Sequence, residues 1–247
     1  MSSTRLPGKI MLQSKGKTML EHMLERISHS TTLDKIIIAT TTEKIDDKIE
    51  ELSKKLDFFC VRGSEEDVLS RFNLASEKSN ADIIVRLCGD SPLLDGEIID
   101  KSVVTFLENK FDYVNNLLPL PKTYPDGLSV EVFSSKLLKD MHFNAKKPSE
   151  REHVTQYIWN NFEKYNIHRI DYEKNFSNLR FNLDYIEDYE FINKIFELLY
   201  DTKKYFLLKD IIGLLEMKKE IIRINQHIIP NLGLKKSIER DKLLGFK

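Results

Sequence analysis

The chain has 247 residues, 41% of them hydrophobic, which suits one large domain or one domain with a small appendage and excludes a multidomain array. A formal net charge of −1, with no Lys/Arg cluster beside aromatic residues, argues against nucleic acid as a partner. No stretch approaches the ~18 apolar residues of a membrane span, and the N-terminus lacks the apolar core of a signal peptide. We therefore expect a cytoplasmic protein with no membrane partner.

Helical and strand patterns alternate along the first part of the chain. An apolar stripe predicts a helix over 19–27, and the β-branched run KIIIAT predicts a strand over 35–40. The alternation then continues, with helices predicted over 43–56 and 64–78 and strands over 58–63 and 81–89. Ser64 and Asp67 resemble a helix-capping pair. Such alternation predicts a doubly wound, mostly parallel α/β sheet, in which ligands bind beyond the carboxyl ends of the strands.

The pattern changes after FDYVNN at 111–116. The turn YPDG at 124–127 precedes LSVEVF, whose alternation predicts an antiparallel or edge strand over 128–133. The next patterns predict a helix over 149–162, strands near 167–172 and 179–184, and a helix from Ile186 to about Tyr200. From Phe206 onward the sequence predicts one or two helices, with a loop around 230–233. We therefore divide the chain into a domain over 1–205 and a helical C-terminal extension, packed on it, over 206–247.

The two cysteines, Cys60 and Cys88, both lie in apolar runs typical of strands. We predict reduced thiols in the core of a cytosolic protein, and neither a disulfide nor a metal pair.

The opening loop has the composition of an anion-binding segment. Arg5 and Lys9 flank Leu6-Pro7-Gly8 beside three small hydroxyl residues, and no acid precedes Glu21. Such a loop before a helix can wrap a polyphosphate with backbone N–H groups, guanidinium and ammonium, although a solvated basic tail has the same composition. The stretch SKGKT at 14–18 imitates the end of a Walker A loop, but Met11 stands where that motif requires glycine. An ordinary P-loop is therefore excluded.

Two acids follow apolar strand patterns. Asp90 stands after a predicted buried strand, between Gly89 and a nearby proline, and is suited to hold Mg²⁺ against a phosphate; a turn or capping role is the alternative. Asp184 ends the pattern LRFNLD, and Asp188 suits the first turn of the following helix. Two strand-end carboxylates that met at one cation would form a nucleotide–metal site. Weaker candidates, for which a structural or turn role is the alternative, are Asp126, Glu131, Arg151 and His153.

Seven stretches together resemble the cytidylyltransferase family that activates acidic sugars, most closely its spore-coat polysaccharide biosynthesis branch, with Kdo and acylneuraminate cytidylyltransferases as relatives. In order, they are SSTRLPGK at 2–9, ATTTEKIDD at 39–47, GSEEDVLSRF at 63–72, RLCGDSPLLD at 86–95, YPDGLSVEVF at 124–133, SEREHVT at 149–155 and FNLDYIEDYEFI at 181–192. Their order and spacing span nearly the whole chain.

The resemblance implies a Rossmann-like fold of the nucleotide-diphospho-sugar transferase type, with 1–205 as the nucleotidyltransferase domain. It implies CTP and an acidic sugar as substrates, Mg²⁺ as cofactor on Asp90 and Asp184, and triphosphate binding by the loop that carries Ser3, Thr4, Arg5 and Lys9. Arg71, Asp126, Glu131, Arg151 and His153 become candidates for base or sugar contacts. Relatives are often dimers, and a homodimer is an expectation for which the sequence indicates no interface.

One departure from the family concerns the start of the chain. Family members begin with a hydrophobic strand that runs into this loop, and Met1 sits where the segment after that strand ends. The expected fold therefore lacks its first strand, which is usually interior. We hypothesise that Met1 is an internal methionine of a longer natural protein.

The expected reaction is in-line attack by a sugar-acid hydroxyl on the α-phosphorus of CTP, with release of pyrophosphate. This chemistry needs charge neutralisation and alignment, for which Arg5, Lys9 and Asp90 are the catalytic candidates. A nucleotide-sugar-dependent glycosyltransferase is an alternative, although the chain contains no Asp-x-Asp triplet of the kind those enzymes commonly use. A non-catalytic, nucleotide-binding paralogue is a second alternative, favoured by the missing strand.

Overall fold

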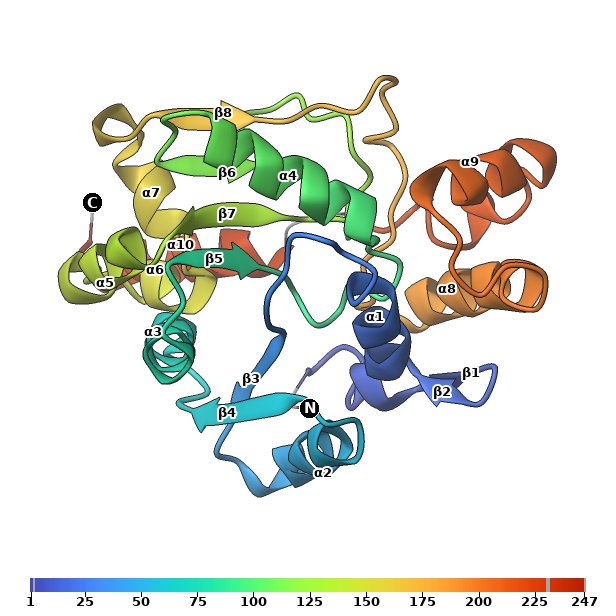
Figure 1. Cartoon of the computed structure of the whole chain (residues 1–247), viewed down its shortest axis with the longest axis horizontal. Helices are drawn as coiled ribbons and strands as arrows, with labels where there is room; N and C mark the ends of the chain where they lie inside the picture. The colour runs from blue at the N-terminus through green and yellow to red at the C-terminus, as the bar shows by residue number, and fades with distance from the viewer. Residues whose placement is uncertain (2, 230–231, 247) are drawn as a thin grey trace.

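Three hydrogen-bonded sheets organise the chain, whose computed structural model describes residues 1, 3–229 and 232–246 (Figure 1). The strands are β1 (Gln13–Ser14), β2 (Lys17–Thr18), β3 (Ile37–Thr41), β4 (Phe59–Gly63), β5 (Ile83–Arg86), β6 (Tyr113–Asn115), β7 (Glu131–Ser134) and β8 (Ile167–Arg169). The helices are η1 (Lys9–Met11), α1 (Met19–Ile27), η2 (Lys44–Asp46), α2 (Asp47–Lys55), α3 (Val68–Ser79), α4 (Gly96–Glu108), α5 (Ser135–Asn144), α6 (Pro148–His153), α7 (Gln156–Asn160), η3 (Phe162–Lys164), α8 (Ile186–Leu199), α9 (Leu208–Met217), η4 (Ile222–Ile224) and α10 (Leu232–Leu243), where η marks a 3-10 helix.

The largest sheet has the strand order β5-β7-β6-β8. Strand β7 runs antiparallel to both β5 and β6, whereas β6 and β8 are parallel. The antiparallel strand predicted from LSVEVF is confirmed, but β7 lies inside the sheet and not at its edge. Its inner position explains why Glu131, Val132 and Phe133 are all buried. Helix α4 covers β6 and β7 on one face (Figure 1).

A separate parallel pair is formed by β3 and β4, and β1 with β2 forms a small antiparallel hairpin. The α/β class is confirmed, with mixed parallel and antiparallel pairing. Among the described residues, none before Gln13 belongs to a strand, and β3 and β5 are each paired along one edge.

The helices lie where the apolar spacing predicts them, but some begin at a different residue. Helix α3 begins at Val68, because Asp67 is its N-cap and accepts a hydrogen bond from the Ser70 nitrogen at 2.9 Å. The hydroxyl of Ser64 accepts from the Asp67 nitrogen at 3.1 Å, so it shapes the turn before the helix and does not start it. The single helix predicted over 149–162 is two, α6 and α7, because Val154 between them has a left-handed φ of 56°.

The strand predicted over 179–184 is wrong, because the segment is extended but joins no ladder. It makes one isolated bridge, between Arg180 and Asp126. The Asp126 nitrogen donates to Leu179 O at 3.0 Å, and the Phe181 nitrogen donates to Asp126 O at 2.7 Å. The approach needs Gly127, since a Cβ there would lie 2.3 Å from the Asn182 nitrogen. The turn YPDG therefore packs against this segment.

The two cysteines are free thiols, as predicted, but neither is fully buried in the core. Cys60 lies in β4 and Cys88 just after β5, and both are free thiols, but each is half-buried. Burial raises the pKa of both thiols, so they stay protonated at neutral pH.

The residues after Phe206 share their packing with the rest of the chain. Buried side chains of α9 join the same apolar cluster as those of α1 and α8. Helix α10 lies against α6, where Ser237 donates to Glu152 Oε2 at 2.8 Å. The loop predicted around 230–233 falls partly on 230–231, outside the described residues, and α10 already includes 232 and 233. Over the described part of the chain, no helix has the length and apolar character needed to cross a membrane.

Candidate active site

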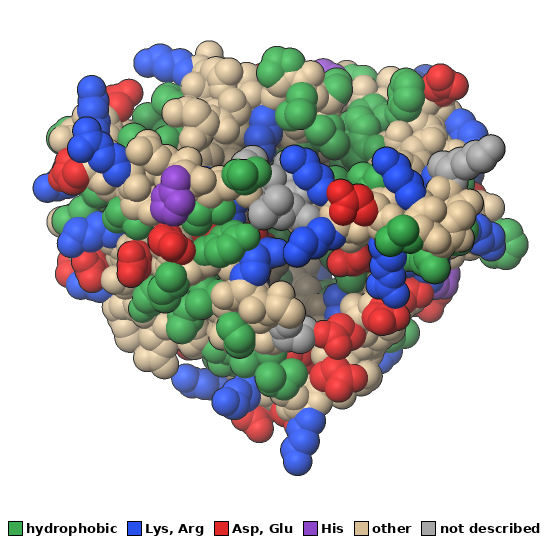
Figure 2. Space-filling view, turned by 180° about the vertical axis from the view of Figure 1, so that it is seen from behind, with side chains coloured by type: hydrophobic (Ala, Val, Ile, Leu, Met, Phe, Trp, Pro, Cys, Tyr) green, Lys and Arg blue, Asp and Glu red, His purple; other side chains and the backbone are tan. Residues whose placement is uncertain are grey.

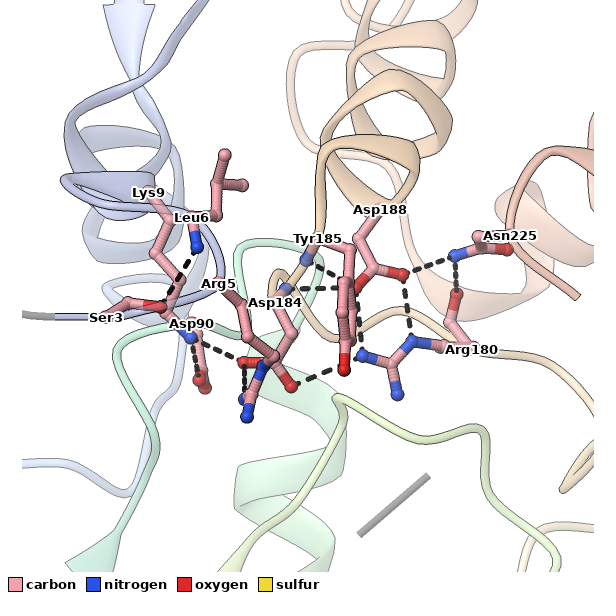
Figure 3. A network of polar contacts seen from close by, with 10 residues as sticks. All are labelled: Ser3, Arg5, Leu6, Lys9, Asp90, Arg180, Asp184, Tyr185, Asp188 and Asn225. Carbon is pink, nitrogen blue, oxygen red and sulfur yellow. Dashed lines mark hydrogen bonds and ion pairs between the residues drawn. The ribbon is translucent and has the colours of Figure 1, made fainter. Parts of the chain in front are cut away.

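The N-terminal loop brings two cations to two acids (Figure 3). Gly8 adopts a left-handed φ of 68°, which turns the chain into η1 at Lys9. Lys9 Nζ donates to Asp90 Oδ2 at 2.6 Å and to Asp184 Oδ1 at 2.8 Å. Arg5 Nη2 donates to the same Asp184 oxygen at 2.9 Å. The two acids that the sequence placed after separate apolar runs therefore converge on one ammonium group.

A main-chain contact explains why these acids meet. Asp90 lies in the turn after β5, and its carbonyl oxygen accepts a hydrogen bond from the Leu183 nitrogen at 3.0 Å. Asp184 follows Leu183 directly and precedes Tyr185, the N-cap of α8. The strand end and the helix start are thus joined at the residues that carry the site.

Burial and charge both act on this cluster. Burial alone would lower the pKa of Lys9, but the Asp90 and Asp184 carboxylates outweigh it and raise that pKa. Burial alone would raise the pKa of Asp184, but Lys9 and Arg5 hold it at about 2. Lys9 and Asp184 are therefore both charged at neutral pH. On the face seen in Figure 2, basic and acidic side chains surround a hollow near the centre.

A second layer of contacts lies behind Asp184. Asp188 is fully buried, and Arg180 donates to its carboxylate from Nε at 2.8 Å and from Nη2 at 2.9 Å. Arg180 Nη2 also donates to Asp184 Oδ2 at 3.3 Å, and Asn225 Nδ2 donates to Asp188 Oδ1 at 3.0 Å. The sequence alone indicates a first-turn position for Asp188, and no local pattern singles out Arg180 or Asn225.

The donor set fits a magnesium ion. Asp90 and Asp184 present oxygens within 2.8 Å of one cationic nitrogen, so both can face the same cation. Within the described ranges, no three His, Cys, Asp or Glu side chains gather at one point. Mg²⁺ is commonly held by one or two carboxylates together with water and substrate phosphates, which is what two acids beside Arg5 and Lys9 allow.

Arg71 reaches inward from α3 without a partner. Its Nε is buried and makes no hydrogen bond, and across the described part of the chain no hydrogen bond or ion pair involves its guanidinium. Gly63 makes room for it, since a Cβ there would lie 2.7 Å from Arg71 Cγ. Burial lowers the pKa of Arg71, as expected for a desolvated cation. An anionic ligand would supply the missing partner.

Three further residues that the sequence predicts at the site, two in the N-terminal loop and one in the turn YPDG, differ in their contacts. Ser3 Oγ accepts a hydrogen bond from the Leu6 nitrogen at 3.3 Å and so shapes the loop, whereas Thr4 is exposed. Asp126 is buried and pairs with Lys122, next to Arg180.

Glu131 is not an open substrate contact. Its side chain is 2% exposed, and its carboxylate accepts hydrogen bonds from Arg86, Tyr113 and Thr155, the last at 2.6 Å. Arg86 and Glu131 face each other in the register of β5 and β7. The prediction of sugar contact is therefore corrected for Glu131, because the carboxylate is a buried counter-ion.

Arg151 and His153 hold helices together. Arg151 pairs with Asp67 at the start of α3 and donates to His142 O of α5 at 2.7 Å. His153 Nε2 lies 3.0 Å from Ser237 Oγ of α10, and burial lowers its pKa. Neither contacts the Lys9 cluster, and their binding of a sugar stays a prediction.

Comparison with known proteins shows which family the chain belongs to. Residues 1–227 match the sequence model of the family described as Cytidylyltransferase. Spore coat polysaccharide biosynthesis protein SpsF of Bacillus subtilis (strain 168) is 32% identical over 204 residues, 80% of this chain and 83% of that protein.

Two solved structures are similar as well. A cytidylyltransferase from Leptospira borgpetersenii serovar Hardjo-bovis superposes with a TM-score of 0.86 and 37% identity, covering 93% of this chain and 95% of the other. CMP:2-keto-3-deoxy-manno-octonic acid synthetase complexed with CTP has a TM-score of 0.61 at 15% identity, covering 79% of this chain and 94% of the other, a likeness of fold alone.

Proposed function

Because the chain belongs to the cytidylyltransferase family, we propose that it transfers CMP from CTP to an acidic sugar and releases pyrophosphate, for surface polysaccharide biosynthesis. The observation that carries the proposal is the convergence of Asp90 and Asp184 on Lys9, with Arg5 beside them. A polyphosphate carries several negative charges, and this cluster offers two cations and two acids whose oxygens face one point, as a divalent cation requires. The acidic acceptor is supported by the sugar acid in the name of the synthetase of similar fold, and the role in polysaccharide biosynthesis is supported by the name of SpsF.

In the proposed reaction the acceptor hydroxyl attacks the α-phosphorus of CTP and a new O–P bond forms. The bond from the α-phosphorus to the oxygen that bridges to the β-phosphorus breaks, pyrophosphate leaves with that oxygen, and the hydroxyl proton is released to water. Lys9 and Arg5 would neutralise the departing pyrophosphate, since both cations lie within the cluster beside the two acids. Asp90 and Asp184 would hold Mg²⁺, which when bound polarises the α-phosphate and neutralises its charge. Arg71, whose buried Nε makes no hydrogen bond to any described residue, is proposed to bind a nucleotide phosphate.

The experiment is a pyrophosphate-release assay with CTP, Mg²⁺ and a panel of sugar acids, namely Kdo and sialic, legionaminic and pseudaminic acids. We expect a CMP-sugar product, identified by mass spectrometry, with CTP and not with ATP, GTP or UTP. Asp184→Asn should lower kcat about 100-fold or more, whereas Asp201→Asn, at an exposed surface ion pair, should leave it unchanged. CTP binding without product from any acid would instead favour the non-catalytic paralogue.

A further inference from the structure

The segment after α9 reaches the candidate active site through one amide side chain. Asn225 follows η4 and is 2% exposed. Its Nδ2 donates to the main-chain oxygen of Arg180 at 3.0 Å and to Asp188 Oδ1 at 3.0 Å (Figure 3). The C-terminal part of the chain therefore contacts both residues that lie behind Asp184.

Those two residues fix Asp184 in different ways. Asp188 Oδ2 accepts a hydrogen bond from the Asp184 main-chain nitrogen at 3.0 Å, which fixes the backbone of the acid. Arg180 Nη2 donates to Asp184 Oδ2 at 3.3 Å, which orients the carboxylate and leaves Oδ1 to face Lys9. Because Asp188 is fully buried, water does not compete for these contacts.

The origin of the donors shows what Asn225 adds. Arg180, Asp184 and Tyr185 donate to the Asp188 carboxylate, and all three belong to the same short stretch of chain as Asp188. Among the described residues, Asn225 is the one donor to Asp188 from outside that stretch. Without it, the stretch keeps its internal bonds but loses the side-chain tie between this carboxylate and the C-terminal segment.

We propose that Asn225 is a positioning residue of the active site. By holding Asp188 and the Arg180 main chain, it sets the direction in which the Asp184 carboxylate faces a divalent cation, and it does not itself touch that cation. The inference rests on the proposed function, since it takes Asp184 as a cation ligand. It also gives the C-terminal segment a part in the chemistry as well as in the apolar core.

The test measures Mn²⁺ binding in the absence of nucleotide, by electron paramagnetic resonance titration of the full chain. Asn225→Leu removes the donor at similar volume, and Asn225→Ser keeps a hydroxyl donor. The matched control is Gln226→Leu, because Gln226 is the neighbouring amide and is exposed. Thermal unfolding of each variant establishes that it is folded at the titration temperature.

We expect the Mn²⁺ Kd to rise about 10- to 100-fold in Asn225→Leu, as for other residues that orient metal ligands, and to stay unchanged in Gln226→Leu. Asn225→Ser should recover part of the affinity. A merely structural role would lower Tm without changing the Mn²⁺ Kd of the folded protein. If Asn225→Leu fails to unfold cooperatively, Asn225→Ala carries the same expectation.

Two failures are distinguishable. A wild-type Mn²⁺ Kd in folded Asn225→Leu, with wild-type turnover intact, would overturn the positioning role alone. A wild-type protein that neither binds Mn²⁺ nor turns over CTP would overturn the proposed function, and this inference with it.

Discussion

Replacing Lys9 by methionine removes the ammonium group that lies between Asp90 and Asp184. Their carboxylate oxygens lie 2.6 and 2.8 Å from Lys9 Nζ, and the two side chains are 28% and 19% exposed. Two such oxygens are about 5 Å apart at most, and two unit charges at that distance repel by about 3 kcal/mol at an effective dielectric constant of about 20. Lys9→Met should therefore lower the free energy of unfolding by about 3 kcal/mol at pH 7.

Added Mg²⁺ should reverse this loss. In the variant no ammonium has to leave the two acids, so MgCl₂ should stabilise Lys9→Met more than the wild-type protein. The assay is urea unfolding at pH 7, with and without MgCl₂. Lys15→Met is the matched control, because Lys15 pairs with Asp201 at an exposed site where a salt bridge contributes about 1 kcal/mol or less.

Equal unfolding free energies for Lys9→Met and Lys15→Met, or equal stabilisation of variant and wild type by MgCl₂, would refute this reasoning. Either result would mean that Asp90 and Asp184 do not depend on Lys9 as their shared counter-ion.

Three further changes test other parts of the account. Arg71→Met should raise the KM for CTP about 10-fold or more in steady-state assays while leaving the free energy of unfolding unchanged or higher, because it removes a half-buried cation whose buried Nε makes no hydrogen bond to any described residue; an unchanged KM would contradict phosphate binding. Gly127→Ala should destabilise the protein by more than about 2 kcal/mol in urea unfolding, because the methyl group would meet the backbone at 182 and φ is 88°; a wild-type value would show that the turn can move aside. Asp46→Asn should flatten the stability curve between about pH 2 and pH 5. Burial alone would raise the pKa of Asp46, but hydrogen bonds from Thr40 and Thr41 hold it at about 2, below the unfolded value, so its contribution to stability is complete above about pH 5 and is lost as the pH falls towards 2. A curve of unchanged steepness in Asp46→Asn would assign that acid dependence to other carboxylates.

The spacing of apolar residues predicts most helices and strands of this fold, because the buried face of each element is formed by its own apolar side chains. The stripe over α1 and the β-branched run at β3 are examples. The extended segment at 179–184 shows what the spacing of apolar residues does not predict, namely whether an extended segment pairs with another strand. Phe181 and Leu183 alternate with polar residues and are buried as in a strand, but whether a partner strand lies beside them depends on the turn at Gly127, far along the chain.

For the candidate site, too, the sequence predicts individual residues but not which of them lie together. The sequence placed Asp90 and Asp184 at the ends of apolar runs, but their meeting depends on a hydrogen bond between distant main-chain atoms, from Leu183 to Asp90. The role of Glu131 could not be predicted, because Arg86 becomes its counter-ion only through the register of β5 and β7. Asn225 carries no local signal, since a single amide in a helical region is equally common on a surface.

A crystal structure with CTP and Mn²⁺ would test the central claim most directly. The account predicts an anomalous Mn²⁺ peak between the carboxylates of Asp90 and Asp184, with the triphosphate beside Arg5 and Lys9. A nucleotide bound elsewhere, or a metal peak away from both acids, would contradict it.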